Sequence, residues 1–203
     1  MLRLAFLSTL LLSAGMAGEG EELLGTRPKE WTAEHWLNSE PLTLEELRGR
    51  VVLVRFWTGP GCPYCRASAP ALNDFHRRYA ADGLTVVGLY HHKGPGRADP
   101  EAVARYAREL GFAFPVAIDP EWRTLRAWWL DGHDRDWTSV TFLLDRWGAI
   151  RHIHPGGQYV EGDQAHARLK AAIERLLTEP APHSSCIHTG ISRRPCRTRQ
   201  IST

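Results

Sequence analysis

The sequence predicts one α/β domain whose central mixed sheet is flanked by helices. Val51–Trp57 (VVLVRFW) is a continuous β-branched and aromatic run, which is typical of a strand buried on both faces. Farther along, strand-like runs alternate with segments that carry apolar residues at helical spacing. Near the end, two strand-like runs are separated only by the turn 145–148, which is a hairpin signal. Right-handed crossovers make the first strands parallel, and the hairpin adds an antiparallel edge.

The first helix is predicted to follow Cys62. Leu72, Phe75 and Tyr79 recur at helical spacing, and the helix is expected to end near Gly83. The run Leu84–Tyr90 (LTVVGLY) then predicts the second strand of the sheet.

Two further helices are predicted to open with the same Asp-Pro-Glu triplet. Residues 99–101 supply a capping side chain, a proline suited to the first turn and an acid near the positive end of the helix dipole. This helix is expected to stop at Gly111, before a short strand at 114–118. The second triplet, at 119–121, predicts a helix that runs towards Trp129.

The hairpin and one more helix complete the predicted domain. Runs 140–144 (VTFLL) and 149–154 (AIRHIH) form the hairpin strands, and Asp163 can cap a last helix with an apolar face. We therefore expect one domain over 42–179, with no internal repeat.

The composition is that of a globular protein and excludes few functions. The chain has 203 residues, of which 43% are hydrophobic and 24% charged, enough for one well-filled core. The formal net charge of +2 is too small to indicate nucleic acid as a partner.

The first 17 residues have the pattern of a signal peptide. Arg3 provides a short basic region, residues 4–12 an apolar run, and Ala17 a small residue at the expected cleavage point. The apolar run is too short for a stable membrane span, although an uncleaved anchor is the alternative. We expect an exported protein, periplasmic or otherwise outside the cytoplasm, in an oxidising compartment. Residues 18–41 are expected to form a leader segment that lies over the domain.

The last segment, 180–203, differs in composition from the domain. Residues 183–203 contain four arginines, no acid and no apolar periodicity, so we expect a disordered basic tail. Cys186 and Cys196 lie in this tail, too far apart in sequence for a compact metal motif.

Cys62 and Cys65 enclose Pro63 and Tyr64 at the predicted junction between a buried strand and a helix. The amide groups and dipole of a helix N-terminus stabilise a thiolate, so the pKa of Cys62 should be lowered. Cys65, one turn later, should be shielded from solvent. This arrangement suits two-step thiol–disulfide exchange, in which one thiol attacks a substrate disulfide and the other resolves the mixed disulfide.

Two other interpretations of this cysteine pair are weaker. A tetrahedral zinc site needs two more ligands, and the domain has no second CxxC or HxxxH pattern. A structural disulfide across two residues would add little stability, because a short loop removes little entropy from the unfolded chain.

Two segments resemble parts of thioredoxin-like proteins, especially of the exported TlpA/ResA/DsbE-like branch. The active-site region of that branch is similar to VVLVRFWTGPGCPYCRASAPALNDF, and its closing hairpin is similar to VTFLLDRWGAIRHIHPGGQY. The resemblance implies a thioredoxin-like fold and a thiol–disulfide oxidoreductase. It makes Cys62 the attacking and Cys65 the resolving cysteine, with Trp57 beside the site. It implies no cofactor besides the redox-active Cys62–Cys65 disulfide. The implied partners are protein thiols or disulfides and an electron-donor thiol protein, with reduction of substrates the favoured direction.

Three departures from this family concern the site. The loop 58–61 has four residues where the family usually has three. Arg55 stands where thioredoxin has a buried acid, so either another group assists proton transfer or the longer loop turns Arg55 outwards. Ser139 stands where the family has a cis-proline that faces the cysteines. A trans peptide is expected there, because a cis bond before a residue other than proline is costly.

Two alternative functions use the same fold. The pairs His91–His92 and His152–His154, together with the cysteines, could hold Cu(I) in a metallochaperone, although known copper-delivery relatives have CxxxC. A thiol peroxidase would need a reactive cysteine close to a threonine and an arginine. Thr58 and Arg66 are near Cys62 in sequence but not in that arrangement.

Overall fold

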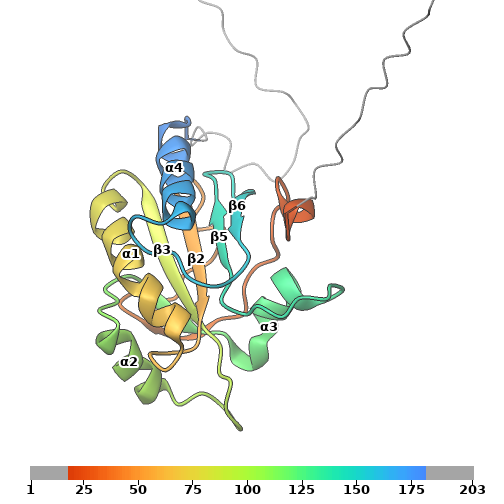
Figure 1. The fold of residues 1–203 in the computed structure, drawn as a ribbon, viewed down its shortest axis with the longest axis vertical. Coiled ribbons are helices and arrows are strands. Elements are labelled where there is room, and N and C mark those ends of the chain that lie inside the picture. The colour runs from red at the N-terminus through yellow and green to blue at the C-terminus, as the bar shows by residue number, and fades with distance from the viewer. Residues whose placement is uncertain (1–17, 182–203) are drawn as a thin grey trace, which may run out of the picture.

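Six strands form one mixed sheet at the centre of the molecule (Figure 1). The computed structural model describes residues 18–181, so the expected signal peptide at 1–17, most of the expected tail, and both Cys186 and Cys196 lie outside the described residues. The order across the sheet is β1-β4-β3-β2-β5-β6. The strands are β1 (Glu34–Leu37), β2 (Val51–Trp57), β3 (Leu84–Tyr90), β4 (Val116–Ile118), β5 (Thr141–Leu144) and β6 (Ile150–His154).

The strand pairing confirms the predicted α/β class with a mixed sheet. β2 pairs with β3 and β3 with β4 in parallel, whereas β5 pairs antiparallel with β2 and with β6. The hairpin turn is closed by Asp145, whose carboxylate accepts hydrogen bonds from the backbone of Trp147 and Ala149. A short aspartate side chain that satisfies its own turn is a common way to reverse a chain.

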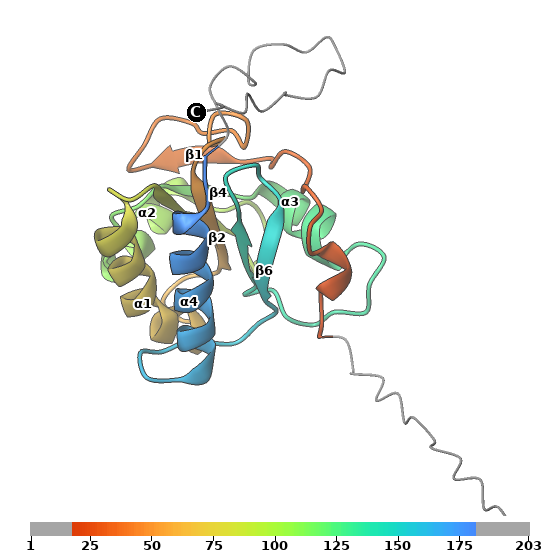
Figure 2. The ribbon, with the colours of Figure 1, turned by 90° about the horizontal axis from the view of Figure 1, so that it is seen from above.

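The helices divide between the two faces of the sheet (Figure 2). α1, α2 and α4 share one face, and α3 lies on the other with the chain that precedes β2. No helix within residues 18–181 is both long and apolar enough to cross a membrane. The helices are α1 (Pro63–Tyr79), α2 (Pro100–Glu109), α3 (Arg123–Leu125), which continues as a π-turn over Arg126–Leu130, and α4 (Gln164–Thr178).

β2 supplies side chains to both cores. Successive side chains of a strand point to opposite faces, so Val52, Val54 and Phe56 pack towards α3. Val51, Leu53 and Trp57 pack towards α1, α2 and α4. The same alternation places Arg55 between Leu53 and Trp57 on the face that carries α1.

Part of the segment expected to be a leader joins the sheet as β1, a strand that the sequence did not predict. β1 pairs antiparallel with β4 in an irregular register, and His35 within it has a positive φ of 53°. After the strand, the Asn38 amide donates to the backbone carbonyls of Phe112 and Phe114. The four residues EHWL contain little apolar pattern, so only the pairing with a distant strand makes them a strand.

The helix predicted to open at 119–121 begins three residues later. Glu121 and Trp122 have positive φ values of 54° and 62°, which interrupt a helix at these positions. The buried carboxylate of Asp119 instead accepts hydrogen bonds from the backbone of Thr124 and Leu125, at 2.8 and 2.9 Å. Asp119 therefore satisfies the first amides of α3 across the intervening turn.

Candidate functional site

Trp57 ends β2 in a buried aromatic contact. Its ring meets Tyr90 and Phe112 edge-to-face, with centroid distances of 5.1 Å in both cases. Gly88 on the neighbouring strand leaves room for the indole, because a Cβ there would lie 3.1 Å from the indole nitrogen. The packed indole gives the loop 58–61 a rigid starting point.

Cys62 caps the N-terminus of α1. The Cys62 backbone is extended, and Pro63 follows in the first helical turn. The Sγ of Cys62 accepts a hydrogen bond from the Cys65 amide at 3.4 Å. Partial burial acts to raise the pKa of the Cys62 thiol, but hydrogen bonds from Cys65, Thr58 and the Tyr64 backbone outweigh it. The pKa of Cys62 is therefore lowered, as the amides of a helix N-terminus would produce for a thiolate.

Cys65 lies one helical turn later, with only 2% of its surface exposed. Burial raises the pKa of the Cys65 thiol, and its hydrogen bond with Cys62 adds to this effect. The Thr58 hydroxyl lies 3.9 Å from its Sγ. Both thiols are free, so the site holds one half-buried thiol with a lowered pKa and one buried thiol with a raised pKa.

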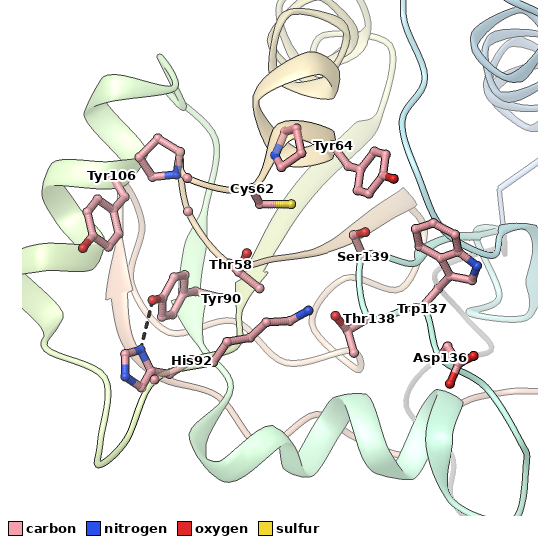
Figure 3. A pocket seen from close by; sticks show the side chains of 16 residues that line it. Thr58, Cys62, Tyr64, Tyr90, His92, Tyr106, Asp136, Trp137, Thr138 and Ser139 are labelled. Atoms are coloured by element: carbon pink, nitrogen blue, oxygen red, sulfur yellow. Dashed lines mark hydrogen bonds between the residues drawn. The ribbon is translucent and has the colours of Figure 1, made fainter.

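A groove with a cavity volume of about 720 Å³ opens beside Cys62. Figure 3 shows Tyr64 and Trp137 on one side of Cys62, and Tyr90 and Tyr106 on the other. Tyr64 and Trp137 meet edge-to-face at 5.4 Å and remain 37% and 43% exposed. Exposed aromatic rings beside a reactive thiol offer apolar contact area to a bound chain.

Ser139 lines the same groove, from the loop that precedes β5 (Figure 3). Ser139 is buried, and its backbone carbonyl accepts a hydrogen bond from Arg55 Nη1 at 2.5 Å. All peptide bonds within residues 18–181 are trans, including the bond before Ser139. The structure thus brings Trp57, Cys62, Pro63, Tyr64, Cys65 and Ser139 together around one groove and the core beneath it.

Arg55 is buried, so the suggestion that the longer loop turns it outwards is wrong. Only 1% of its surface is exposed, and its guanidinium donates to Ser139 O, Thr141 Oγ1 and Gly157 O. The sequence signal that could have shown this is the strict alternation along β2, which places residue 55 on an apolar face. Trp137 was also missed, because no local pattern marks a loop residue whose aromatic partner is remote in sequence.

The histidines considered for copper lie in separate surroundings. His91 is fully buried against Trp122, whereas His92 Nδ1 lies 3.2 Å from the Tyr90 hydroxyl. His152 and His154 lie on β6. Within residues 18–181 no three His, Cys, Asp or Glu side chains gather closely enough to hold a metal ion.

Arg66, considered for a peroxidase site, contacts the surface of α2. Its Nη2 lies 3.1 Å from Glu109 Oε1, and both side chains are largely exposed. Thr58, the other residue of that proposal, contacts Cys65 at 3.9 Å. The two side chains therefore do not meet around Cys62.

The part of the chain that holds the sheet and the cysteine pair is similar to known proteins. The family model described as Redoxin matches residues 31–173. Protein DipZ of Mycobacterium bovis is 31% identical over 164 residues, which are 79% of this chain and 22% of that protein. The thiol-disulfide oxidoreductase ResA of Halalkalibacterium halodurans is 27% identical over 122 residues, 60% of this chain and 62% of that protein. This chain thus spans only part of the length of either relative.

A solved structure is also similar to this chain. The crystal structure of a thiol-disulfide isomerase from Corynebacterium glutamicum is 28% identical, with a TM-score of 0.58, and the match covers 77% of this chain and 100% of that one. The chain therefore belongs to the Redoxin family, and it is similar to proteins described as thiol–disulfide oxidoreductases and thiol-disulfide isomerases.

Proposed function

We propose that the protein is an exported oxidoreductase that reduces disulfides of other proteins, with Cys62 as the attacking and Cys65 as the resolving thiol. The observation that supports this assignment is the difference between the two thiols. Cys62 is the half-buried thiol with the lowered pKa, whereas Cys65 is buried and has a raised pKa. Since the thiolate is the nucleophile, Cys62 is ready to attack at a pH where Cys65 is still protonated.

The exchange takes place in two steps. The Cys62 thiolate attacks one sulfur of the substrate disulfide, so a mixed disulfide forms and the other substrate sulfur leaves and takes up a proton. Cys65 then loses its proton and attacks Cys62 Sγ, which releases the second substrate thiol and leaves a Cys62–Cys65 disulfide. A donor dithiol protein returns two electrons to this disulfide, and no other cofactor takes part.

The neighbouring residues shape this site in different ways. Pro63 provides the first turn of α1 without an unused amide hydrogen, and Trp57 anchors the loop that leads to Cys62. Tyr64 offers an exposed ring, and Ser139 forms the groove wall across from Cys62. We assign the groove to a polypeptide segment that carries apolar residues beside its cysteine.

Trapping of the mixed disulfide tests the assigned roles. In a Cys186→Ser/Cys196→Ser background, Cys65→Ser should accumulate a covalent adduct with a disulfide substrate, because no resolving thiol remains. Mass spectrometry of the digested adduct should place the substrate on Cys62. The matched Cys62→Ser variant should form little adduct, since its remaining thiol is buried. An adduct that forms mainly on Cys65 would reverse the assignment.

The aromatic groove predicts a preference for peptide substrates. Trp137→Ala should lower kcat/KM for a disulfide peptide with apolar flanking residues by about 2- to 10-fold, because an aromatic contact contributes roughly 0.5–1.5 kcal/mol. The rate with hydroxyethyl disulfide should fall less. Trp147→Ala is the matched control, since Trp147 lies in the β5–β6 turn outside the groove. Equal losses for both substrates in Trp137→Ala would contradict a peptide-binding role.

Thiol trapping in intact cells tests both export and the reducing direction. The proposal of export rests on the pattern of residues 1–17 and applies whether this segment is cleaved or retained as an anchor. In the Cys186→Ser/Cys196→Ser background, a membrane-impermeant maleimide should label Cys62 in intact cells, because an exported protein is accessible to it. Most molecules should be labelled without prior reduction if the protein acts as a reductant. Labelling only after lysis would contradict export, and a pair that is mostly oxidised at steady state would contradict the reducing direction.

A further inference from the structure

Arg55 is a buried cation without a carboxylate partner among residues 18–181. None of the ion pairs in this region includes it, and its three hydrogen-bond acceptors are neutral oxygens. Its Nε has no hydrogen-bond partner in the same region. Burial of an unpaired charge is costly, so an arginine in the centre of a strand needs an explanation beyond packing.

The Arg55 guanidinium lies on the same side of the sheet as Cys65. Arg55 Cζ is 5.2 Å from the centre of the Tyr159 ring, and the Tyr159 amide donates to Ser68 Oγ at 3.2 Å. Ser68 follows Cys65 by one helical turn on the buried face of α1. Tyr159 thus lies between the arginine and the part of α1 that carries the buried thiol. The positive charge of Arg55 acts to lower the pKa of Cys65, against the larger effect of burial.

Other titratable groups near Arg55 are neutral around pH 7. Burial, followed by the charges of Lys93 and Arg55, lowers the pKa of His91 to about 3. Burial, followed by the charge of Arg55, lowers the pKa of His154 to about 4. The phenol of Tyr159 has a pKa raised by its complete burial. These buried groups therefore carry no charge near neutral pH and do not offset the guanidinium of Arg55.

We propose that Arg55 is a positioning residue for the resolving step, in which its guanidinium compensates the charge of the Cys65 thiolate while it holds the Ser139 carbonyl. This inference rests on the proposed exchange reaction. In this step Cys65 gives its proton to solvent and its sulfur attacks Cys62 Sγ. The Cys62–Cys65 bond forms as the bond from Cys62 to the substrate breaks, and the departing substrate sulfur takes up a proton. The cation lowers the cost of a buried thiolate, so a buried acid is not required to accept the proton.

A thiolate titration tests this proposal without any turnover. Cys62→Ser, combined with Cys186→Ser and Cys196→Ser, leaves Cys65 as the sole thiol, whose ionisation is followed by ultraviolet absorbance. Adding Arg55→Met should raise the midpoint by roughly one pH unit, which is the lower end of the effect of a close opposite charge. Arg55→Lys should keep most of the wild-type midpoint, because it retains the charge.

Arg50→Met is the matched control. Arg50 also donates to backbone carbonyls, those of Ala80 and Leu84, but it lies just before β2, at the end of the strand remote from Trp57. Its loss should lower stability without moving the Cys65 midpoint. If Arg55→Met does not fold, Arg55→Gln provides a neutral side chain that still donates a hydrogen bond, and the same upward shift is expected.

Two results would overturn the proposal. One is an unchanged Cys65 midpoint in the neutral variants, which would reduce Arg55 to a structural clamp. The other is an equal shift in Arg55→Lys and Arg55→Met, which would show that charge is not responsible. Either result leaves the exchange activity of the intact Cys62–Cys65 pair untouched, so failure here is distinct from failure of the proposed function.

Discussion

The position at which β2 ends determines the rest of the reactive site. β2 pairs with β3 on one side and β5 on the other, and all seven of its residues are buried. Trp57, its last residue, is held by aromatic contacts to Tyr90 and Phe112. Only four residues then separate Trp57 from Cys62, so Cys62 reaches the start of α1 within a short span. A helix that begins there must turn Cys65 towards the sheet, and the two thiols acquire unequal environments.

The same strand joins segments that are distant in sequence. Arg55 donates to the backbone at Ser139 and at Gly157, which belong to the loops before β5 and after β6. These loops carry Trp137, which forms one wall of the groove, and Tyr159, which packs beneath α1. Gly156 lies directly against the Trp137 side chain with no room for a Cβ, so the two loops are in direct contact. One buried guanidinium therefore couples the wall of the groove to the core beneath the thiols.

The parts of the structure with strong local signals were predictable from sequence. The apolar run of β2, the proline after Cys62 and the Asp-Pro-Glu triplet before α2 each specify local conformation with little help from the rest of the chain. β1 was not predictable, because its residues become a strand only through pairing with β4. The start of α3 was displaced by positive φ values at Glu121 and Trp122, which neither residue type favours.

The site was predictable in outline and less so in its supporting residues. The cysteine pair and its position on α1 follow from short-range pattern, whereas the burial of Arg55 depends on acceptors 84 to 102 residues away. A charged residue within an apolar strand is ordinarily expected to reach solvent. In this protein the alternation of side chains along β2 places Arg55 inside, and three neutral acceptors surround its guanidinium, two in distant loops and one on β5.

The assigned roles of Cys62 and Cys65 require that the two thiols ionise at clearly different pH. An NMR titration of isotope-labelled cysteine β-carbons measures both in the same molecule, with Cys186 and Cys196 replaced by serine. The Cys62 resonance should titrate first as the pH rises, with a midpoint below that of an ordinary thiol, and Cys65 should follow above it. Coincident midpoints, or Cys65 titrating before Cys62, would show that the two thiols do not have the assigned roles.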